Sequence, residues 1–159
     1  MQEREYIQML IQSLEKKIQA LEKIHSYNVE QTQILQTSDV DFEAWEAIVE
    51  KKSEEIDQIN FYDQGFENVY ERVKGAFETN REEYKGEIKE LQRLITRITE
   101  LSVDVQVQEE RNKQLAQTCF ARYKKQSRQF KENRKALDVY RNQMRKTNVL
   151  DAQFLDKRN

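Results

Sequence analysis

Apolar residues recur every three or four positions from Tyr6 to Leu35. This alternating spacing keeps them on one stripe of a helix. The first five members are strongly apolar and the last four are mixed: Ile7, Ile11, Leu14, Ile18, Leu21, His25, Asn28, Thr32 and Leu35. The pattern predicts an amphipathic helix over about residues 3–36, with its apolar stripe packed against other helices.

Two shorter helices are expected next, over about residues 40–60 and 64–78. Ser38, followed three residues later by Asp41, is typical of an N-cap with an acidic first turn. Residues 63–65, Asp-Gln-Gly, interrupt the apolar pattern between the two helices. Thr79 and Glu82 have the spacing of a capping box, which predicts a new helix from about residue 80. An alternative is that the helix continues through Thr79.

One heptad register continues from Tyr84 to Met144 and predicts a last helix over about residues 80–146. At 1.5 Å per residue, this helix would be about 90–100 Å long. The predicted fold is therefore all-α: an elongated antiparallel helical bundle or coiled coil of three to four helices, the last one very long. Residues 1–147 are expected to form a single domain, and residues 148–159 a flexible C-terminal tail.

Composition supports a helical chain. The 159 residues include no proline and three glycines, which leaves too little turn chemistry for a sheet. Charged residues make up 35%, well above the roughly 25% of an average domain, so the apolar cores are expected to be narrow.

Charge is divided unequally along the chain. Residues 1–110 hold 13 Lys and Arg against 25 Asp and Glu, a net charge of −12, whereas residues 111–159 hold 14 against 4, a net charge of +10. This asymmetry indicates either internal charge complementarity or an acidic partner for the C-terminal region.

Candidate catalytic and metal chemistry is sparse. His25 is the only histidine and Cys119 the only cysteine, which excludes an internal disulfide and leaves too few ligands for a zinc site. Both lie on apolar seams and are interpreted as packing residues. With no glycine-rich phosphate loop, we expect no enzyme activity, no metal and no cofactor. No segment resembles a signal peptide or a membrane span, so a cytoplasmic protein without membrane insertion is expected.

Several seam positions are polar rather than apolar: Asn28, Glu109, Asn112, Gln126 and Asn133. Buried polar residues at such positions can fix helix register at some cost in stability. The alternative is that they loosen the seam so that it opens for a partner.

Residues 122–135 are strongly basic, and Lys124, Arg128, Lys131 and Lys135 would lie on the helix face opposite the apolar stripe. The simplest interpretation is a solvated face, which could also dock on the acidic helices. Nucleic acid, an anionic membrane and an acidic protein groove are the other options. Nucleic acid is not expected, because the whole chain is acidic and no binding motif is present.

The apolar stripe continues through Phe130, Leu137, Tyr140 and Met144, beyond the region that the shorter helices can easily cover. An uncovered apolar stripe on a helix can bind a partner helix. The alternatives are that the chain dimerises through this stripe or folds back over it.

Three stretches resemble flagellar type III export chaperones of the FlgN/FliT kind. These stretches are the hydrophobic-acidic run over residues 42–56, the segment Glu109–Asn112, and residues 137–144 followed by residues 151–157. The order of these stretches also resembles the family along most of the chain.

The resemblance implies a cytoplasmic chaperone that binds the helical terminal region of a late flagellar subunit, a hook-filament junction or cap protein. Such a chaperone prevents premature assembly and brings its client to the export machinery. Arg141 and Arg145 would steer an acidic client helix. The implied partner-binding residues are Phe130, Leu137, Tyr140, Arg141, Met144 and Phe154. The alternative is a structural coiled-coil scaffold without a client, and either protein could be a monomer or a homodimer.

Overall fold

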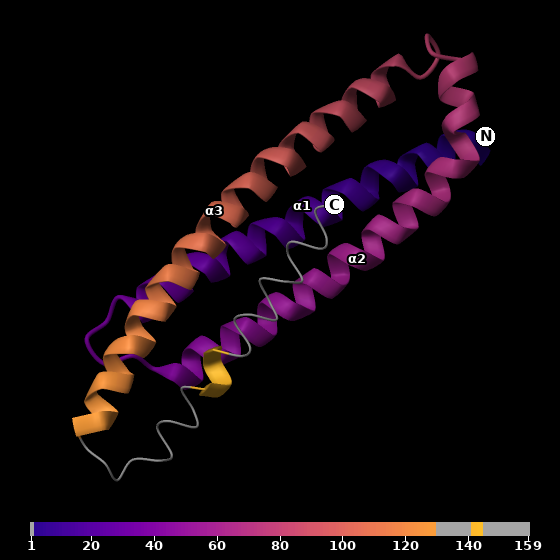
Figure 1. Cartoon of the computed structure of the whole chain (residues 1–159). Coiled ribbons are helices and arrows are strands. Elements are labelled where there is room, and N and C mark those ends of the chain that lie inside the picture. The colour runs from indigo at the N-terminus through magenta and orange to yellow at the C-terminus, as the bar shows by residue number, and fades with distance from the viewer. Residues whose placement is uncertain (1, 130–140, 145–159) are drawn as a thin grey trace. The chain divides into compact units, whose positions relative to one another are not determined.

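A computed structural model describes residues 2–129 and 141–144 (Figure 1). It contains three long helices, α1 (Gln2–Leu35), α2 (Phe42–Thr79) and α3 (Lys85–Gln129). Residues 141–144 form a separate helical turn, and none of the described residues is in a strand. The all-α prediction is confirmed.

The chain divides into two compact units. Unit 1 consists of Met1–Lys23 and Glu55–Asp104, and unit 2 of Ile24–Glu54 and Val105–Asn159. Each of the three helices therefore contributes one segment to each unit. The expectation of a single domain over residues 1–147 stays a prediction, and the tail expected over residues 148–159 lies outside the described residues.

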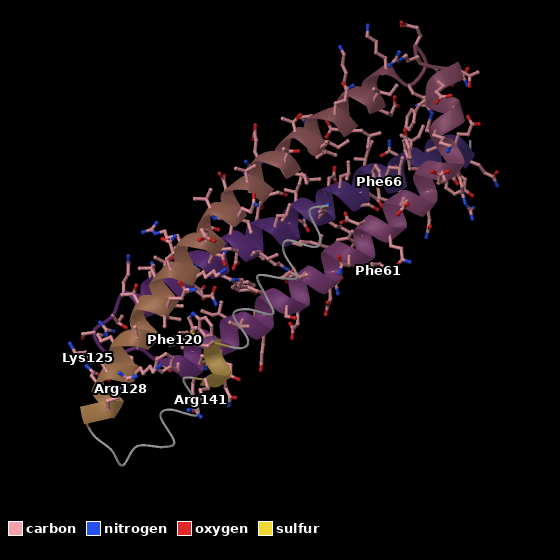
Figure 2. The ribbon with its side chains drawn as sticks, in the orientation of Figure 1. Phe61, Phe66, Phe120, Lys125, Arg128 and Arg141 are labelled. Carbon is pink, nitrogen blue, oxygen red and sulfur yellow. The ribbon has the colours of Figure 1, made fainter. Side chains whose placement is uncertain are left out.

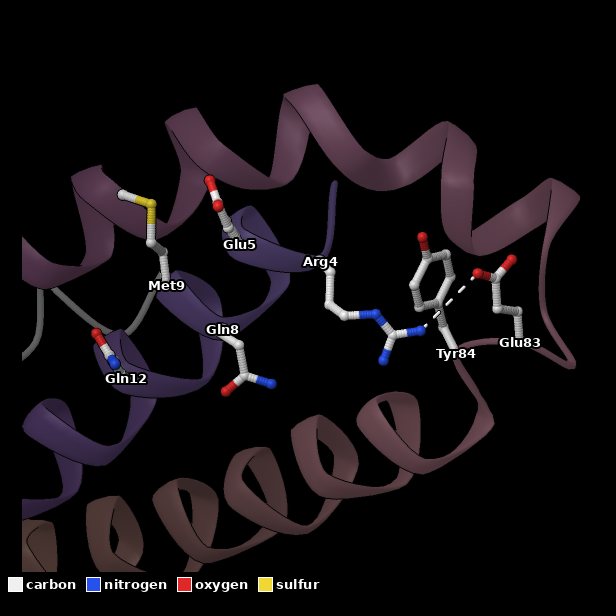
Figure 3. A pocket seen from close by; sticks show the side chains of 7 residues that line it. All are labelled: Arg4, Glu5, Gln8, Met9, Gln12, Glu83 and Tyr84. Carbon is white, nitrogen blue, oxygen red and sulfur yellow. Dashed lines mark ion pairs between the residues drawn. The ribbon is translucent and has the colours of Figure 1, made fainter. Parts of the chain in front are cut away.

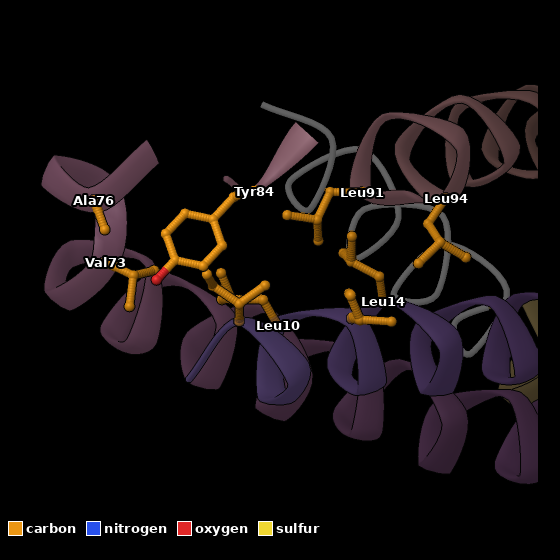
Figure 4. Close-up of a cluster of buried hydrophobic side chains, with 9 residues drawn as sticks. Leu10, Leu14, Val73, Ala76, Tyr84, Leu91 and Leu94 are labelled. Atoms are coloured by element: carbon orange, nitrogen blue, oxygen red, sulfur yellow. The ribbon is translucent and has the colours of Figure 1, made fainter. Parts of the chain in front are cut away.

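Unit 1 is built around an apolar cluster drawn from all three helices (Figure 4). Lys17 pairs with Asp63 at 2.7 Å and Lys23 with Glu55 at 3.6 Å, so α1 and α2 run antiparallel here. Burying each large aliphatic side chain contributes about 1.5–3 kcal/mol, which makes the cluster the main source of stability in this unit. Its buried members are Ile7, Leu10, Ile11, Leu14, Val73, Ala76, Tyr84, Leu91 and Leu94.

Helix α2 is continuous across Gly65, so the break predicted between residues 60 and 64 is wrong. A glycine inside a helix costs only about 1 kcal/mol relative to alanine. Contacts on both sides of Gly65 outweigh that cost: Asp63 pairs with Lys17, and Phe66 and Val69 pack against the apolar cluster. Tertiary packing thus joins the two predicted helices into one.

The N-cap of α2 is Asp41, and the prediction of Ser38 at this position is wrong. Asp41 Oδ1 accepts a hydrogen bond from the Ala44 N–H at 3.1 Å, while the Asp41 carbonyl accepts from the Trp45 N–H at 3.1 Å. This is the arrangement in which the cap side chain satisfies a backbone donor of the first turn. The acidic residue expected inside the first turn is therefore the cap itself.

Replacing Asp41 with alanine is expected to lower the free energy of unfolding by about 1 kcal/mol, because one N–H of the first turn loses its acceptor. Chemical denaturation followed by circular dichroism measures this change. Asp41→Asn keeps an acceptor and serves as the control. If both variants lost the same stability, the contribution would come from charge and not from capping.

The break predicted between residues 78 and 80 is present, but the start of the next helix and the role of Thr79 differ from the prediction. Helix α2 ends at Thr79, whose hydroxyl donates a hydrogen bond back to the Gly75 carbonyl. A turn follows, in which the Lys85 N–H donates to the Glu82 carbonyl at 3.5 Å, and α3 begins at Lys85. The side chain of Thr79 thus bonds within α2 instead of capping a helix from residue 80, and no continuous helix passes through Thr79.

The last helix is shorter than predicted. Helix α3 covers Lys85–Gln129, 45 residues, in place of residues 80–146. Tyr123 and Gln143 both contact Phe42. Twenty residues of straight helix would separate them by about 30 Å, too far for both to reach one residue. A single straight helix from residue 80 to residue 146 is therefore wrong.

The heptad register assigned to α3 is only partly correct. Counted from Tyr84 in steps of four and three residues, the predicted register includes Ile95 and Ser102. Ile95 is nevertheless 48% exposed, whereas its neighbour Leu94 is buried. Leu101 is buried in the same way, next to the predicted seam residue Ser102. A helix that packs against two others buries a wider face than the narrow stripe of a two-stranded coiled coil. The contact face of α3 is therefore broader than the predicted stripe.

Candidate partner-binding surface

Unit 2 contains an aromatic cluster where α2 begins and α3 ends. The ring of Phe42 stacks on Phe120 with centroids 5.6 Å apart and meets the edge of Tyr123 at 4.9 Å. Trp45 contacts the same Phe120 ring edge-on at 6.0 Å. Such aromatic pairs add about 0.5–1.5 kcal/mol each beyond their buried area. The cluster therefore fixes these two helix ends against each other.

The hydroxyl of Tyr123 connects α3 to the chain segment before α2. It accepts a hydrogen bond from the Val40 N–H at 3.0 Å and donates one to Asp39 Oδ1 at 3.3 Å. An otherwise unpaired backbone donor at this helix start is thereby satisfied. The heptad register that begins at Tyr84 includes position 123, so Tyr123 lies on the contact side of its helix as that register predicts.

Gln143 anchors the helical turn of residues 141–144 to the start of α2. Its side-chain amide donates to the Phe42 carbonyl and to Glu46 Oε2, both at 3.1 Å. Gln143 is buried, while Arg141 is exposed and Met144 is half-buried (Figure 2). This short segment therefore lies beside the aromatic cluster with a cationic side chain facing solvent.

Two of the six predicted partner-binding residues can be placed, namely Arg141 and Met144. The remaining predicted partner-binding residues lie outside the described part of the chain: Phe130, Leu137, Tyr140 and Phe154. Gln143 was not among the predicted residues. Its position next to Met144 was the only available signal, and a polar side chain beside an apolar stripe gives no indication that it binds another helix.

A basic surface covers the last turns of α3. We define this basic surface as the residues Arg122, Lys124, Lys125 and Arg128. Residues 111–129 contain six Lys and Arg and no acidic residue. Lys124, Lys125 and Arg128 are exposed, and no ion pair within the described part of the chain includes them (Figure 2). Such a surface favours approach of an acidic partner.

The only cysteine is buried in unit 2. Cys119 is 3% exposed, and burial raises the pKa of its thiol, although the nearby Arg122 opposes this shift. The Arg122 guanidinium donates to Sγ at 3.8 Å. Since the thiolate is the reactive form, a raised pKa and a buried sulfur both reduce reactivity. The prediction that Cys119 is a seam residue agrees with this burial.

Native Cys119 is expected to react with iodoacetamide at least about 100-fold more slowly than in the denatured chain, because only opened molecules expose the thiol. Mass spectrometry of quenched samples at pH 8 gives both rates. Labelling of the native chain at the denatured rate would show that Sγ is accessible and would contradict its burial.

Three polar seam positions face other helices as predicted. Asn28 and Asn112 are buried, and Glu109 is nearly so. Gln126 is exposed, and Asn133 lies outside the described residues. His25 is half-buried, and its carbonyl, not its ring, accepts the hydrogen bond from Gln108 at 3.2 Å.

A shallow pocket in unit 1 lies beside the first turns of α1 (Figure 3). Arg4 pairs with Glu83 at 3.8 Å and lies 5.6 Å from the centroid of the Tyr84 ring. Burial, followed by a hydrogen bond to Glu3 at 3.2 Å, raises the pKa of Tyr84. Among the described residues that line this pocket, the only cation, Arg4, is thus paired with a carboxylate of the same pocket, and this arrangement assigns the pocket no chemistry.

The described geometry defines a helical protein with an aromatic contact region and a basic surface at the end of α3. Within the described residues, no helix has the length and hydropathy needed to cross a membrane. The model of the FlgN protein family matches residues 1–147. The chain therefore belongs to the FlgN family, the flagellar export chaperones. Comparisons with curated proteins and with solved structures find no significant match.

Proposed function

We propose that this chain is a cytoplasmic chaperone for a late flagellar subunit, a hook-filament junction or cap protein. It binds the helical terminal region of that subunit, prevents its premature assembly and brings it to the export machinery. No nucleic acid and no cofactor takes part. The observation that supports this most is the family match, which extends to residue 147 and so includes the apolar stripe through Met144.

The proposed binding surface is the C-terminal stripe. Its apolar side chains supply the affinity, because a helix that binds in a groove gains most from buried apolar anchors. Arg141, exposed on the helical turn held by Gln143, attracts an acidic client segment. The proposed partner-binding residues are Phe130, Leu137, Tyr140, Arg141, Met144 and Phe154.

Substitutions in the stripe test this proposal. Leu137→Asp and Tyr140→Asp are each expected to weaken client binding by roughly 30-fold or more, the effect of losing a central anchor. Calorimetric titration with the terminal segments of hook-filament junction and cap proteins measures the affinity, and circular dichroism measures helix content. Helix content is expected to stay nearly unchanged.

Val107→Asp is the matched control, because Val107 is an exposed apolar residue of α3 in unit 2. It should leave the affinity unchanged. If the stripe variants instead unfolded the protein, the stripe would be core and its assignment as a binding surface would be wrong. A fixed oligomer that buries the stripe, seen as a constant solution mass over a dilution series, would favour the structural coiled-coil alternative.

A further inference from the structure

Buried polar side chains are concentrated in one of the two units. Among the described residues, all of them belong to unit 2: Asn28, Gln31, Lys52, Asn112 and Gln143. The buried cluster of unit 1, in contrast, is apolar except for the hydroxyl of Tyr84. Burying polar groups costs free energy unless every group is hydrogen-bonded. The interiors of the two units are therefore built on different chemistry.

Lys52 is the most unusual of these residues, since a lysine is almost never fully buried unless paired. Its side chain is 1% exposed, and its ammonium donates to Gln31 Oε1 of α1 at 2.9 Å. It also forms an ion pair with Glu109 of α3, whose side chain is largely buried. One cation on α2 thus joins all three helices.

Further hydrogen bonds link α1 and α3 beside this ion pair. Asn28 donates from its side-chain amide to Gln108 at 3.1 Å, and Asn112 donates to the Asn28 carbonyl at 2.9 Å. Thr32 donates to Asn112 Oδ1 at 2.6 Å. We call these residues and the ion pair the polar layer: Asn28, Gln31, Thr32, Lys52, Gln108, Glu109 and Asn112.

The polar layer fixes helix register but stabilises unit 2 less than an apolar layer would. If one helix slid along its neighbours, all of these bonds would break together. The bonds therefore specify a single register between the helices. Desolvation of a buried ion pair, however, offsets most of its attraction, and an apolar replacement is often more stable. Asn28 Oδ1 and Trp45 Nε1 are also buried without a hydrogen-bond partner among the described residues, which adds a further cost.

We propose that the polar layer makes unit 2 the part of the chain that opens, and that opening prepares it to take up the client. The second part of this proposal, client uptake, rests on the proposed chaperone function. The first part, the opening of unit 2, does not depend on that function. The least stable part of a structure is the part that opens locally. When a ligand binds only the open form, its apparent affinity falls in proportion to the fraction of molecules that are open. Unit 1, with its apolar core, stays closed.

Thiol labelling of the chain without client measures the opening of each unit. Cys119, 3% exposed, reports on unit 2. Val73, 0% exposed and in unit 1, is close in size to cysteine, so Val73→Cys combined with Cys119→Ala reports on unit 1. Each native rate is divided by the rate of the same thiol in denaturant.

Cys119 is expected to label at least about tenfold faster than the thiol at position 73, the ratio that a modest difference in local stability produces. Equal rates, or faster labelling in unit 1, would overturn the proposal. Neither rate involves a client, so this result stands even if the chain binds no flagellar subunit.

The double variant Lys52→Met with Glu109→Leu tests the polar layer itself. It removes both charges and leaves apolar side chains of similar size, so Cys119 labelling should slow by about tenfold. Client affinity should fall by a similar factor, because fewer molecules are open. Labelling that is unchanged or faster would overturn the proposal, as would slower labelling with undiminished affinity. Absence of client binding in the unaltered chain would instead count against the proposed function.

Discussion

Phe120→Ala is expected to lower the free energy of unfolding by about 3–5 kcal/mol, the usual cost of removing a fully buried aromatic ring. Phe120 is 0% exposed and contacts both Phe42 and Trp45. Its ring contacts two α2 side chains, so alanine would leave a cavity at the contact between α2 and α3. The loss of both ring pairs adds to the loss of buried area.

Denaturant-induced unfolding followed by circular dichroism measures this effect. Phe61→Ala is the matched control, since it removes the same atoms from a ring that is 70% exposed (Figure 2). Its effect should stay below about 0.5 kcal/mol, as for an ordinary surface substitution. Equal losses in the two variants would contradict the assignment of Phe120 to the core of unit 2.

Lys52→Met is expected to lower the free energy of unfolding by about 3–5 kcal/mol, because it leaves the buried carboxylate of Glu109 without its cation. The methylene stem of lysine is replaced by an apolar side chain of similar length, so lost packing contributes little. Gln31 also loses the donor at 2.9 Å. The cost is that of an unpaired charge and not of a cavity.

Lys51→Met is the matched control, because Lys51 is the exposed neighbour on the same helix. Its effect should lie within about 0.5 kcal/mol. Adding Glu109→Leu to Lys52→Met should restore all of the lost stability and add about 1 kcal/mol, since the orphaned charge is then removed and an apolar pair replaces the ion pair. If Lys52→Met were as mild as Lys51→Met, the ion pair would not be buried in solution.

The helical class and much of the core could be predicted because they depend on periodicity. The stripe of α1 from Ile7 to Leu35 is buried or half-buried along its whole length. Lys52 could not be predicted, although it occupies a seam position between Val49 and Ile56. A lysine favours exposure on its own, and its burial depends on Glu109, which is distant in sequence.

Helix boundaries were less predictable than helix faces. Gly65 carries a local signal for a boundary, but tertiary contacts keep α2 continuous there. The boundary signalled by the Thr79–Glu82 spacing is present, but Thr79 bonds back to Gly75 and the next helix begins only at Lys85. The length of α3 was overestimated because a heptad register continues in the sequence after Gln129. A register shows which face of a helix would pack, and not whether the chain continues straight.

The candidate site was predicted from an apolar stripe and a family resemblance. Family membership is established by the match over residues 1–147, whereas the stripe remains a proposal. The anchoring of residues 141–144 by Gln143 could not be foreseen, because its partners are the Phe42 carbonyl and Glu46 on a distant segment. Contacts of this kind depend on the fold and leave no periodic signal.

Hydrogen exchange of the full chain, with and without a client terminal segment, tests the central claim most directly. Added client should raise amide protection over residues 130–144 and in the neighbouring segments of unit 2, with little change in unit 1. Protection confined to unit 1, or a stripe already strongly protected in the isolated chain and unchanged by client, would contradict the proposed binding surface.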